Sequence, residues 1–336
     1  MKATEEKPAA KSVSGLLTTV LLLTAVCLVG IFLVRLDSQI PTVANTSQIN
    51  ADRRNKLVAS IAAVGDIACK PGMEVSATQC QMPAVAKSIE AGGHNAVLLL
   101  GDLQYDGGEP ENFASVFTPL WQTLKEKSYA APGNHEYVTK NAEGYFGYWN
   151  GSASSSKQAG DRGKGYYSFD LGSWHVIALN SNCKEVGGCD KNSEQGKWLA
   201  ADLNTHKNRC TLAFWHHPHF SSGRYKGGGF TPDFWDLLYS AHADVVLNGH
   251  DHLYERFAKQ TPGGKPDPVY GIRQFTVGTG GKTLYEFKDT LLENHQTGSD
   301  DKFGYLTLQL YQSGYSWSYK TISEEELDKG SSSCSN

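Results

Sequence analysis

Four short polar segments of this 336-residue chain each begin with glycine and follow an apolar run that predicts a strand. They are Gly65-Asp66, Gly101-Asp102-Leu103-Gln104-Tyr105, Gly133-Asn134-His135-Glu136 and Gly249-His250-Asp251-His252. A fifth segment, Trp215-His216-His217-Pro218, ends another apolar run. Carboxylate, amide and imidazole groups are common metal ligands. Their presence at five strand ends predicts one site that holds a pair of metal ions.

These five motifs, in this order, resemble those of the calcineurin-like metallophosphoesterases, and within them those of the small purple acid phosphatases. The resemblance covers about residues 57–320. It implies a hydrolase of small phosphorylated substrates, with acid phosphatase activity on phosphomonoesters. Two metal ions about 3.5–4 Å apart favour this reaction, because they lower the pKa of a bridging water and clamp the oxygens that gain charge.

The resemblance also implies a role for each polar residue of these motifs. Asp102 would bridge the two ions, and His135 would be the catalytic residue that donates to a phosphate oxygen or to the leaving group. His219, beyond these motifs, would either contact the substrate or take part in loop packing. The remaining ligands divide into two sets, which are Asp66, Tyr105 and His252 for the first ion and Asn134, His216 and His250 for the second.

One departure from the superfamily pattern bears on the identity of the metals. Most of the superfamily carries Asp-x-His at the first motif, whereas this chain has Asp66-Ile67-Ala68 and offers Tyr105 instead, as in purple acid phosphatases. A phenol has a pKa of about 10, so a highly charged cation stabilises its phenolate best. The resemblance therefore implies Fe³⁺ at the Tyr105 site and Zn²⁺, Mn²⁺ or Fe²⁺ at the second. Asp251, between two histidine ligands, is expected to point away from the metals.

Other functions stay open on the same scaffold. Residues around the rim of the site, which the sequence does not locate, would distinguish a phosphomonoesterase from a phosphodiesterase or nucleotide pyrophosphatase. Arg224 and Lys226 are either substrate-binding cations or solvated side chains. The third hypothesis is a cell-surface binding protein that keeps the fold without turnover. The complete ligand set and His135 argue against it, since a non-catalytic protein has little need of them.

The elements that position the motifs are short apolar runs alternating with helical stretches. Helices are predicted over 83–90 and from Ser193 onward. Apolar strands separated by helices indicate a sheet covered on both faces, and β-branched or aromatic segments with little helix indicate a second sheet. The predicted strands are 58–64, 96–100, 211–214 and 244–247 in the first sheet and 165–171, 174–180, 273–277, 305–311 and 315–319 in the second. The fold class predicted is α/β (α+β), a two-sheet β-sandwich flanked by helices, which is the metallophosphoesterase αββα fold.

The N-terminal region predicts export and contact with a membrane. Residues 15–34 carry no charge, and about 20 apolar residues match the roughly 30 Å hydrocarbon core of a bilayer. A cleaved signal peptide usually has a shorter apolar region, of about 7–15 residues, so an uncleaved anchor is favoured over a signal peptide. The predicted segments are an N-terminal tail over 1–13, a transmembrane signal anchor or signal peptide over 14–36, a linker over 37–56, the metallophosphoesterase domain over 57–322 and a C-terminal tail over 323–336.

Charge and cysteine content bound the partners and the compartment. The net charge is −4, and the basic stripe that nucleic-acid binding would need is lacking. Six cysteines follow the apolar segment, and export makes disulfides the expected state, outside the cytoplasm. Proximity favours Cys69–Cys80 and Cys183–Cys189 and leaves Cys210–Cys334, with other pairings open. A zinc cluster is the alternative, but it would need a CxxC spacing that this chain lacks.

Overall fold

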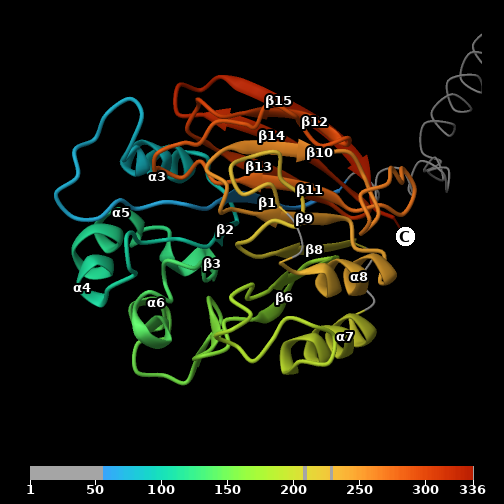
Figure 1. The fold of residues 1–336 in the computed structure, drawn as a ribbon, viewed down its shortest axis with the longest axis horizontal. Helices are drawn as coiled ribbons and strands as arrows, with labels where there is room; N and C mark the ends of the chain where they lie inside the picture. Colours follow the sequence, from blue (N-terminus) through green and yellow to red (C-terminus); the bar gives the residue numbers. More distant parts are fainter. Residues whose placement is uncertain (1–55, 207–209, 228–229, 336) are drawn as a thin grey trace, which may run out of the picture. The chain divides into compact units, whose positions relative to one another are not determined.

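Two β-sheets lie face to face in the computed structural model, which describes residues 56–206, 210–227 and 230–335 (Figure 1). The first sheet is formed, in spatial order, by β15 (Glu326–Ser333), β14 (Gly314–Thr321), β13 (Gly304–Tyr311), β1 (Leu57–Val64), β2 (Ala96–Leu100) and β3 (Ser128–Ala131). The second is formed by β12 (His295–Ser299), β10 (Tyr254–Phe257), β11 (Arg273–Val277), β9 (Val245–Asn248), β8 (Cys210–Phe214), β7 (Trp174–Ala178) and β6 (Tyr167–Leu171). A short pair, β4 (Ser155–Ser156) and β5 (Gly160–Asp161), stands apart.

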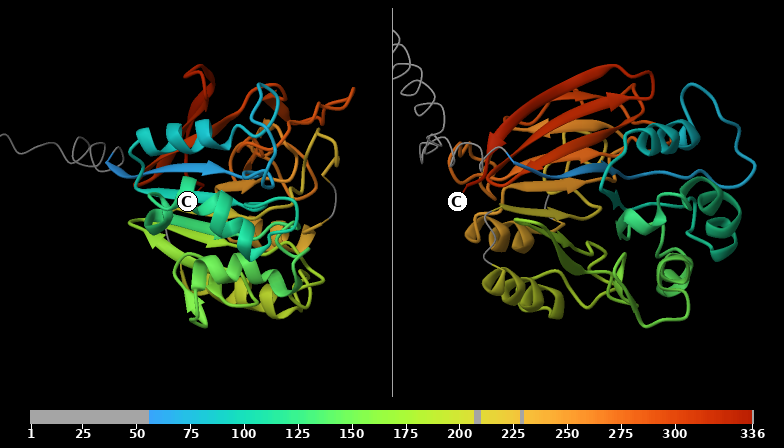
Figure 2. Two further views of the ribbon diagram at one scale, coloured as in Figure 1. Left: turned by 90° about the vertical axis from the view of Figure 1, so that its left-hand side faces the viewer. Right: turned by 180° about the vertical axis from the view of Figure 1, so that it is seen from behind.

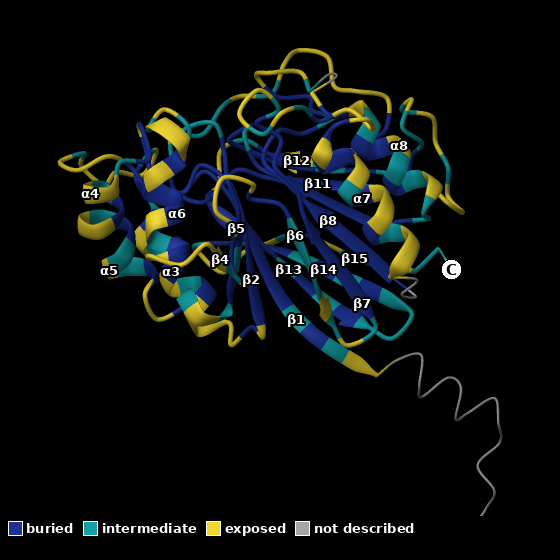
Figure 3. Ribbon diagram, turned by 90° about the horizontal axis from the view of Figure 1, so that it is seen from below, coloured by how far each residue is buried: buried dark blue, intermediate teal, exposed yellow. Residues whose placement is uncertain are grey.

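Helices lie against part of the outer face of each sheet (Figures 2 and 3). The first sheet packs against a group made of α3 (Met82–Ala91), α4 (Pro110–Asn112), η1 (Phe113–Phe117), α5 (Thr118–Trp121), η2 (Lys125–Lys127), η3 (Lys140–Ala142) and α6 (Glu143–Asn150). The second packs against α7 (Glu194–Thr205) and α8 (Pro232–Ser240). The predicted helix–sheet–sheet–helix arrangement is confirmed.

The burial pattern of each strand reflects its place in the layers. All five residues of β2 are buried, because one face of the strand meets the second sheet and the other meets helices. By contrast, β14 alternates between partly exposed and buried positions, as expected of a strand with one face toward solvent. The predicted start of α7 is confirmed, because the Ser193 Oγ accepts the backbone N–H of Gly196 and caps the helix.

Parallel pairing brings the polar motifs together. In the first sheet β1, β2 and β3 run parallel, and in the second β7, β8, β9 and β11 do. The carboxyl ends of parallel strands therefore meet at one edge of each sheet. Asp66, Asp102 and Asn134 follow β1, β2 and β3, while His216 and His250 follow β8 and β9. Each sheet thus supplies part of one site.

The partition of strands between the sheets differs from the prediction. The segment predicted over 305–311 pairs with β1, and the segment predicted over 315–319 pairs with β13, so both lie in the first sheet. Conversely, 211–214 and 244–247 lie in the second sheet with β7 and β11. Hydrophobic composition identifies a strand but carries no information about its neighbour, which is why the partition was wrong.

The predicted C-terminal tail over 323–336 was also wrong. Residues Glu326–Ser333 form β15, which pairs antiparallel with β14. This polar strand gave no apolar signal, but Asp328 accepts hydrogen bonds from Tyr254, Arg256 and Trp317. Those contacts, with the disulfide that follows the strand, hold it at the sheet edge.

Disulfides join the pairs that proximity favoured. Cys69 is bonded to Cys80, Cys183 to Cys189 and Cys210 to Cys334. The zinc-cluster alternative is thereby excluded for these six residues. Within the described ranges, no helix has the length and apolar character needed to cross a bilayer. The predicted anchor at 14–36, with the tail and linker around it, lies outside the described residues.

Candidate metal centre

Three of the predicted ligands have a left-handed backbone at the end of a strand. Asp66, Asp102 and His250 have φ angles of 61°, 50° and 71°. Side chains other than glycine rarely adopt this conformation, and such strain concentrates at functional sites. It turns each side chain sharply out of its strand. A Cβ atom at Gly133 would lie 2.1 Å from Asp102 Oδ1, so only glycine permits these loops to approach so closely.

The first group of donors surrounds the hydroxyl of Tyr105. This hydroxyl lies 2.9 Å from Asp66 Oδ1, 3.0 Å from Asp102 Oδ2 and 3.0 Å from His252 Nε2. His252 Nδ1 donates to the carbonyl oxygen of Thr283 at 2.6 Å, which leaves Nε2 facing the other donors. Backbone orientation of a histidine in this way is typical of metal ligands.

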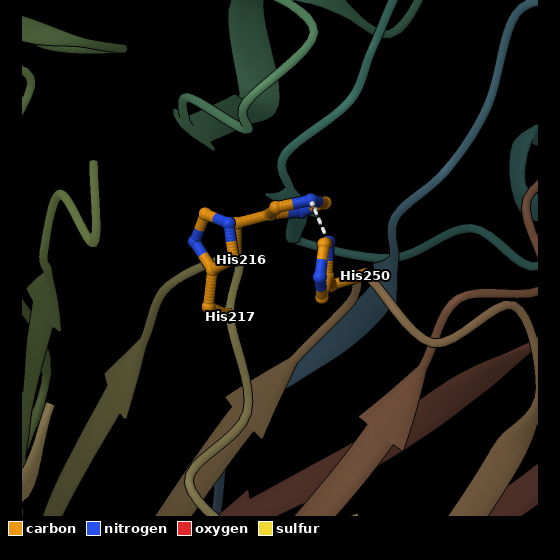
Figure 4. A group of neighbouring side chains, drawn as sticks. All are labelled: His216, His217 and His250. Carbon is orange, nitrogen blue, oxygen red and sulfur yellow. Dashed lines mark hydrogen bonds between the residues drawn. The ribbon is translucent and has the colours of Figure 1, made fainter. Parts of the chain in front are cut away.

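The second group surrounds Nε2 of His216. This atom lies 3.2 Å from Asn134 Oδ1, 3.2 Å from His250 Nδ1 and 3.2 Å from Asp102 Oδ2. Its other ring nitrogen donates to the carbonyl oxygen of Leu100 at 2.9 Å. Figure 4 shows the rings of His216 and His250 directed at each other.

Asp102 connects the two groups. Its Oδ2 atom is near both the Tyr105 hydroxyl and His216 Nε2, while its Oδ1 accepts the backbone N–H of His135 at 2.9 Å. The carboxylate is 2% exposed. One buried carboxylate between two donor groups has the arrangement expected of a bridging ligand.

The donors around Tyr105 have too few protons to satisfy one another by hydrogen bonds. Tyr105 has one hydroxyl proton but faces three acceptor atoms, so two of those contacts lack a proton. A buried acceptor without a donor is costly, and a cation would satisfy all three at once. The donor set of carboxylate, phenol, amide and imidazole groups therefore fits metal ions.

The pKa values of Tyr105, His216 and His250 agree with this shortage of protons. Burial, followed by the charges of Asp102 and Asp66, raises the pKa of Tyr105 well above its usual value. Burial opposes protonation of His216, but Asp102 outweighs it and raises the pKa of His216 to about 9. Burial, together with His216, lowers the pKa of His250. Without a cation, this centre draws in a proton.

Glu136 is a residue of the site whose role the sequence did not reveal. Its buried carboxylate accepts the backbone N–H groups of Asp102 at 2.9 Å, Leu103 at 2.8 Å and Gly133 at 2.7 Å. It therefore ties the Asp102 loop to the Asn134 loop. Its position three residues after Gly133 was visible in the sequence, but only the fold shows which N–H groups it meets.

His135 lies beside the first group. Its Nδ1 donates to the carbonyl oxygen of Asp106, so Nε2 faces the donors, 3.9 Å from Asp102 Oδ2. Its ring centroid is 4.4 Å from that of Tyr105. About a third of the side chain is exposed, so a substrate can reach it.

Three other polar residues of these motifs contact different parts of the chain. His219 packs against Phe220 and Trp235 with Nε2 3.2 Å from the Pro262 carbonyl, and within the described residues it meets none of the seven predicted ligands. These contacts are those expected of the loop-packing alternative for His219. Asp251 accepts from Ser221 and from the Tyr225 backbone, so it braces a loop. His217 lies beside His250, with its Nδ1 2.7 Å from Ser181 Oγ.

Comparison with known proteins agrees with this geometry. The family model for the calcineurin-like phosphoesterase matches residues 59–254. The chain belongs to this family. The matched segment contains every predicted ligand and both sheets contribute to it.

Relatives of this calcineurin-like phosphoesterase are purple acid phosphatases. It is 27% identical to Purple acid phosphatase 18 of Arabidopsis thaliana over 68% of this chain and 54% of that protein. It is 30% identical to Purple acid phosphatase 22 of the same plant, over 59% of this chain and 46% of that protein. The chain thus spans about half the length of these relatives.

The fold has a solved counterpart. A purple acid phosphatase from yellow lupin (Lupinus luteus) seeds superposes with a TM-score of 0.69 at 20% identity, over 82% of this chain and 53% of that one. At this identity the likeness concerns the fold alone, and it confirms the predicted metallophosphoesterase architecture.

Proposed function

We propose that this protein hydrolyses phosphate esters, with phosphomonoesters as its main substrates, at a centre of two metal ions. The position of Asp102 between the Tyr105 and His216 groups carries this proposal. Family membership implies a binuclear centre, and the proton deficit around Tyr105 supports it.

In this proposal Asp102 would be shared between the ions. Asp66, Tyr105 and His252 would hold one ion, Fe³⁺, and Asn134, His216 and His250 would hold the other, Zn²⁺, Mn²⁺ or Fe²⁺. When bound, the pair supplies an activated water and neutralises charge on the phosphoryl oxygens. Trivalent iron fits the first group because its charge is the one that best converts a buried phenol to phenolate.

The protein's own groups orient the histidine rings and protonate the leaving group. Backbone carbonyls fix the Nδ1 protons of His216 and His252, so that both present Nε2 inward. The carbonyl of Asp106 fixes Nδ1–H of His135 in the same way. In its protonated form, His135 then donates its Nε2 proton to the leaving oxygen of the ester. The products are an alcohol and inorganic phosphate.

Location is part of the proposal. Three disulfides favour an oxidising compartment outside the cytoplasm. We propose that residues 14–36 direct export and remain as a membrane anchor, with a cleaved signal as the alternative.

The function is tested with the full chain loaded with iron and zinc. Phenyl phosphate and diphenyl phosphate release the same phenol and separate monoester from diester hydrolysis. We expect rapid turnover of the monoester and little of the diester. Equal or greater turnover of the diester would favour the phosphodiesterase alternative, and no turnover of either by protein that carries both metals would favour the non-catalytic one.

A further inference from the structure

Exposed aromatic rings flank the metal centre on the side of His250. Tyr225 is 44% exposed and Phe230 is 46% exposed. Only one other aromatic residue of the described chain, Tyr270, belongs to the strongly exposed large hydrophobics. Leaving two such rings in water at one place has a hydration cost that a purely structural role does not explain.

Both rings are held against histidines of the site. The Tyr225 ring stacks on His250 with centroids 4.3 Å apart and planes 24° apart. Phe230 lies 5.1 Å from the His217 ring and 6.3 Å from the His250 ring. Since His217 and His250 themselves lie 4.4 Å apart, the two exposed rings border the same part of the centre.

Hydrogen bonds to Asp251 hold the loop that carries Tyr225 in place. The backbone N–H of Tyr225 donates to Asp251 Oδ1 at 3.1 Å, and Asp251 also accepts from Ser221. Asp251 lies between the two histidines His250 and His252 in sequence, so the loop and the centre share one support. The Tyr225 ring is therefore pre-positioned, which lowers the entropy cost of using it to bind a ligand.

A cation completes the rim. The Arg224 guanidinium lies 4.8 Å from the centre of the Tyr285 ring, and Tyr285 stacks on His252 with centroids 4.0 Å apart. Arg224 is exposed and forms no ion pair with any acidic residue of the described ranges. An exposed arginine beside a phosphate-binding centre attracts the anionic substrate whatever its alcohol group.

We propose that Tyr225 and Phe230 form a subsite for an aromatic ring on the alcohol side of the phosphate ester, so that the preferred substrates are nucleoside monophosphates or aryl-bearing phosphates. The inference rests on the proposed function, since it names the substrate class of the same centre. An ester whose phosphate lies at the metals has its alcohol group at the rim, where these two rings offer stacking faces. Stacking of a base on an aromatic side chain contributes about 5-fold to 100-fold in affinity.

The test compares substrates that differ only in the ring. AMP and ribose 5-phosphate share the phosphate and a primary leaving oxygen, but only AMP has a base. Benzyl phosphate and cyclohexylmethyl phosphate are matched in size and in leaving oxygen, but only the first is aromatic. For the metal-loaded full chain we expect kcat/KM to be about 5-fold or more higher for the aromatic member of at least one pair. The pair that responds identifies the ring as a nucleobase or as a simple aryl group.

Variants locate the effect. Tyr225→Leu and Phe230→Leu should each reduce the aromatic to non-aromatic ratio toward one, and Tyr225→Phe should keep it. Using the ratio cancels any disturbance of His250, because both substrates need the same metals. Tyr270→Leu is the matched control, since Tyr270 is 47% exposed and packs on His242 away from the motifs. Arg224→Ala should raise KM for all four esters without changing either ratio.

Binding separates failure of this inference from failure of the proposed function. Benzylphosphonate and cyclohexylmethylphosphonate cannot be hydrolysed, so calorimetry with the metal-loaded protein tests the subsite even if turnover is absent. Tighter binding of benzylphosphonate, lost in Tyr225→Leu, supports the subsite. Ratios near one for both substrate pairs and for the phosphonates, or ratios unchanged in both leucine variants, would overturn it.

Discussion

Two clusters of histidine and aspartate lie toward opposite ends of the parallel strands of the second sheet, on different strands. One is the candidate metal centre beyond the carboxyl ends. The other lies at the amino ends, where His175 of β7 meets Asp170 and Asp202, with His206 stacked on it at 4.4 Å. Both bring ligand-type atoms within coordinating distance of one another, yet their hydrogen bonding differs.

Both ring nitrogens of His175 are hydrogen-bonded to carboxylates of its own cluster. One ring nitrogen of His175 is 2.8 Å from Asp170 Oδ1, and the other is 2.7 Å from Asp202 Oδ2. Ser168 Oγ donates to the second oxygen of Asp202. A protonated imidazole supplies a proton to each carboxylate, whereas around Tyr105 three acceptors share a single proton. Residue types alone do not distinguish the two clusters, but a shortage of protons around Tyr105 does.

Among the variants that test this difference between the clusters, Asp102→Asn is expected to have the largest effect on metal content and activity. Loss of the shared charge should remove both metal ions and reduce phosphomonoester hydrolysis by about 10³-fold or more. Metal analysis of the purified variant, alongside turnover, measures both effects. Retention of two ions with substantial activity would show that Asp102 does not bridge them.

His135→Ala is expected to come next. Turnover should fall about 10²-fold to 10⁴-fold, the usual contribution of a positioned acid, while both ions stay bound. The expected signature is a smaller loss for phenyl phosphate than for benzyl phosphate, since phenolate leaves more readily without a proton. An empty metal site in this variant would make His135 a ligand rather than an acid.

Glu136→Gln should have an intermediate effect. Its carboxylate holds the N–H groups of Asp102, Leu103 and Gly133, and support of this kind contributes about 10-fold to 100-fold to metal affinity or activity. Metal titration of the variant should show weakened affinity. Glu90→Gln, at an exposed position of α3, is the matched control and should change nothing.

The smallest effect on catalysis is expected at the other cluster. His175→Gln should leave metal content and turnover unchanged but reduce the free energy of unfolding by about 2 kcal/mol near pH 5.5, since it removes a charged hydrogen-bonded group. Although burial opposes protonation, Asp202 and Asp170 raise the pKa of His175 above its usual 6.5.

The sign of the pH dependence follows from that direction. Because the folded pKa of His175 is raised, its stabilisation is fully present below the unfolded pKa of about 6.5 and is lost as pH rises through the folded value. Denaturant unfolding of both proteins across this range should show the difference shrinking as pH increases. A difference that grows with pH, or a lost metal ion, would remove the contrast between the clusters.

The candidate donors could be proposed from the sequence because four of their five segments begin with a glycine at the end of an apolar strand. The segment Gly101-Asp102, after an apolar run, predicts both the end of a buried strand and a sharp turn. Such local signals do not depend on tertiary contacts. Sheet partners were not predictable, since β13 and β14 read like strands of either sheet. The polar strand β15 was missed because its attachment depends on Asp328 meeting Arg256 and Trp317, which are distant in sequence.

Roles that depend on tertiary contacts were also beyond the sequence. His219 lies three residues after His216, yet the backbone carries its ring to Trp235. Tyr225 and Phe230 have no motif around them, and only their contacts with His250 and His217 place them at the rim.

The most direct test of the central claim combines metal analysis with the visible spectrum of the iron- and zinc-loaded protein and of Tyr105→Phe. If two ions share Asp102 and one of them binds the Tyr105 oxygen as Fe³⁺, the unaltered protein contains two ions per chain. It is also coloured by a tyrosinate-to-iron charge-transfer band, which Tyr105→Phe lacks. A colourless protein with fewer than two ions per chain, or a band that persists in Tyr105→Phe, would contradict the account.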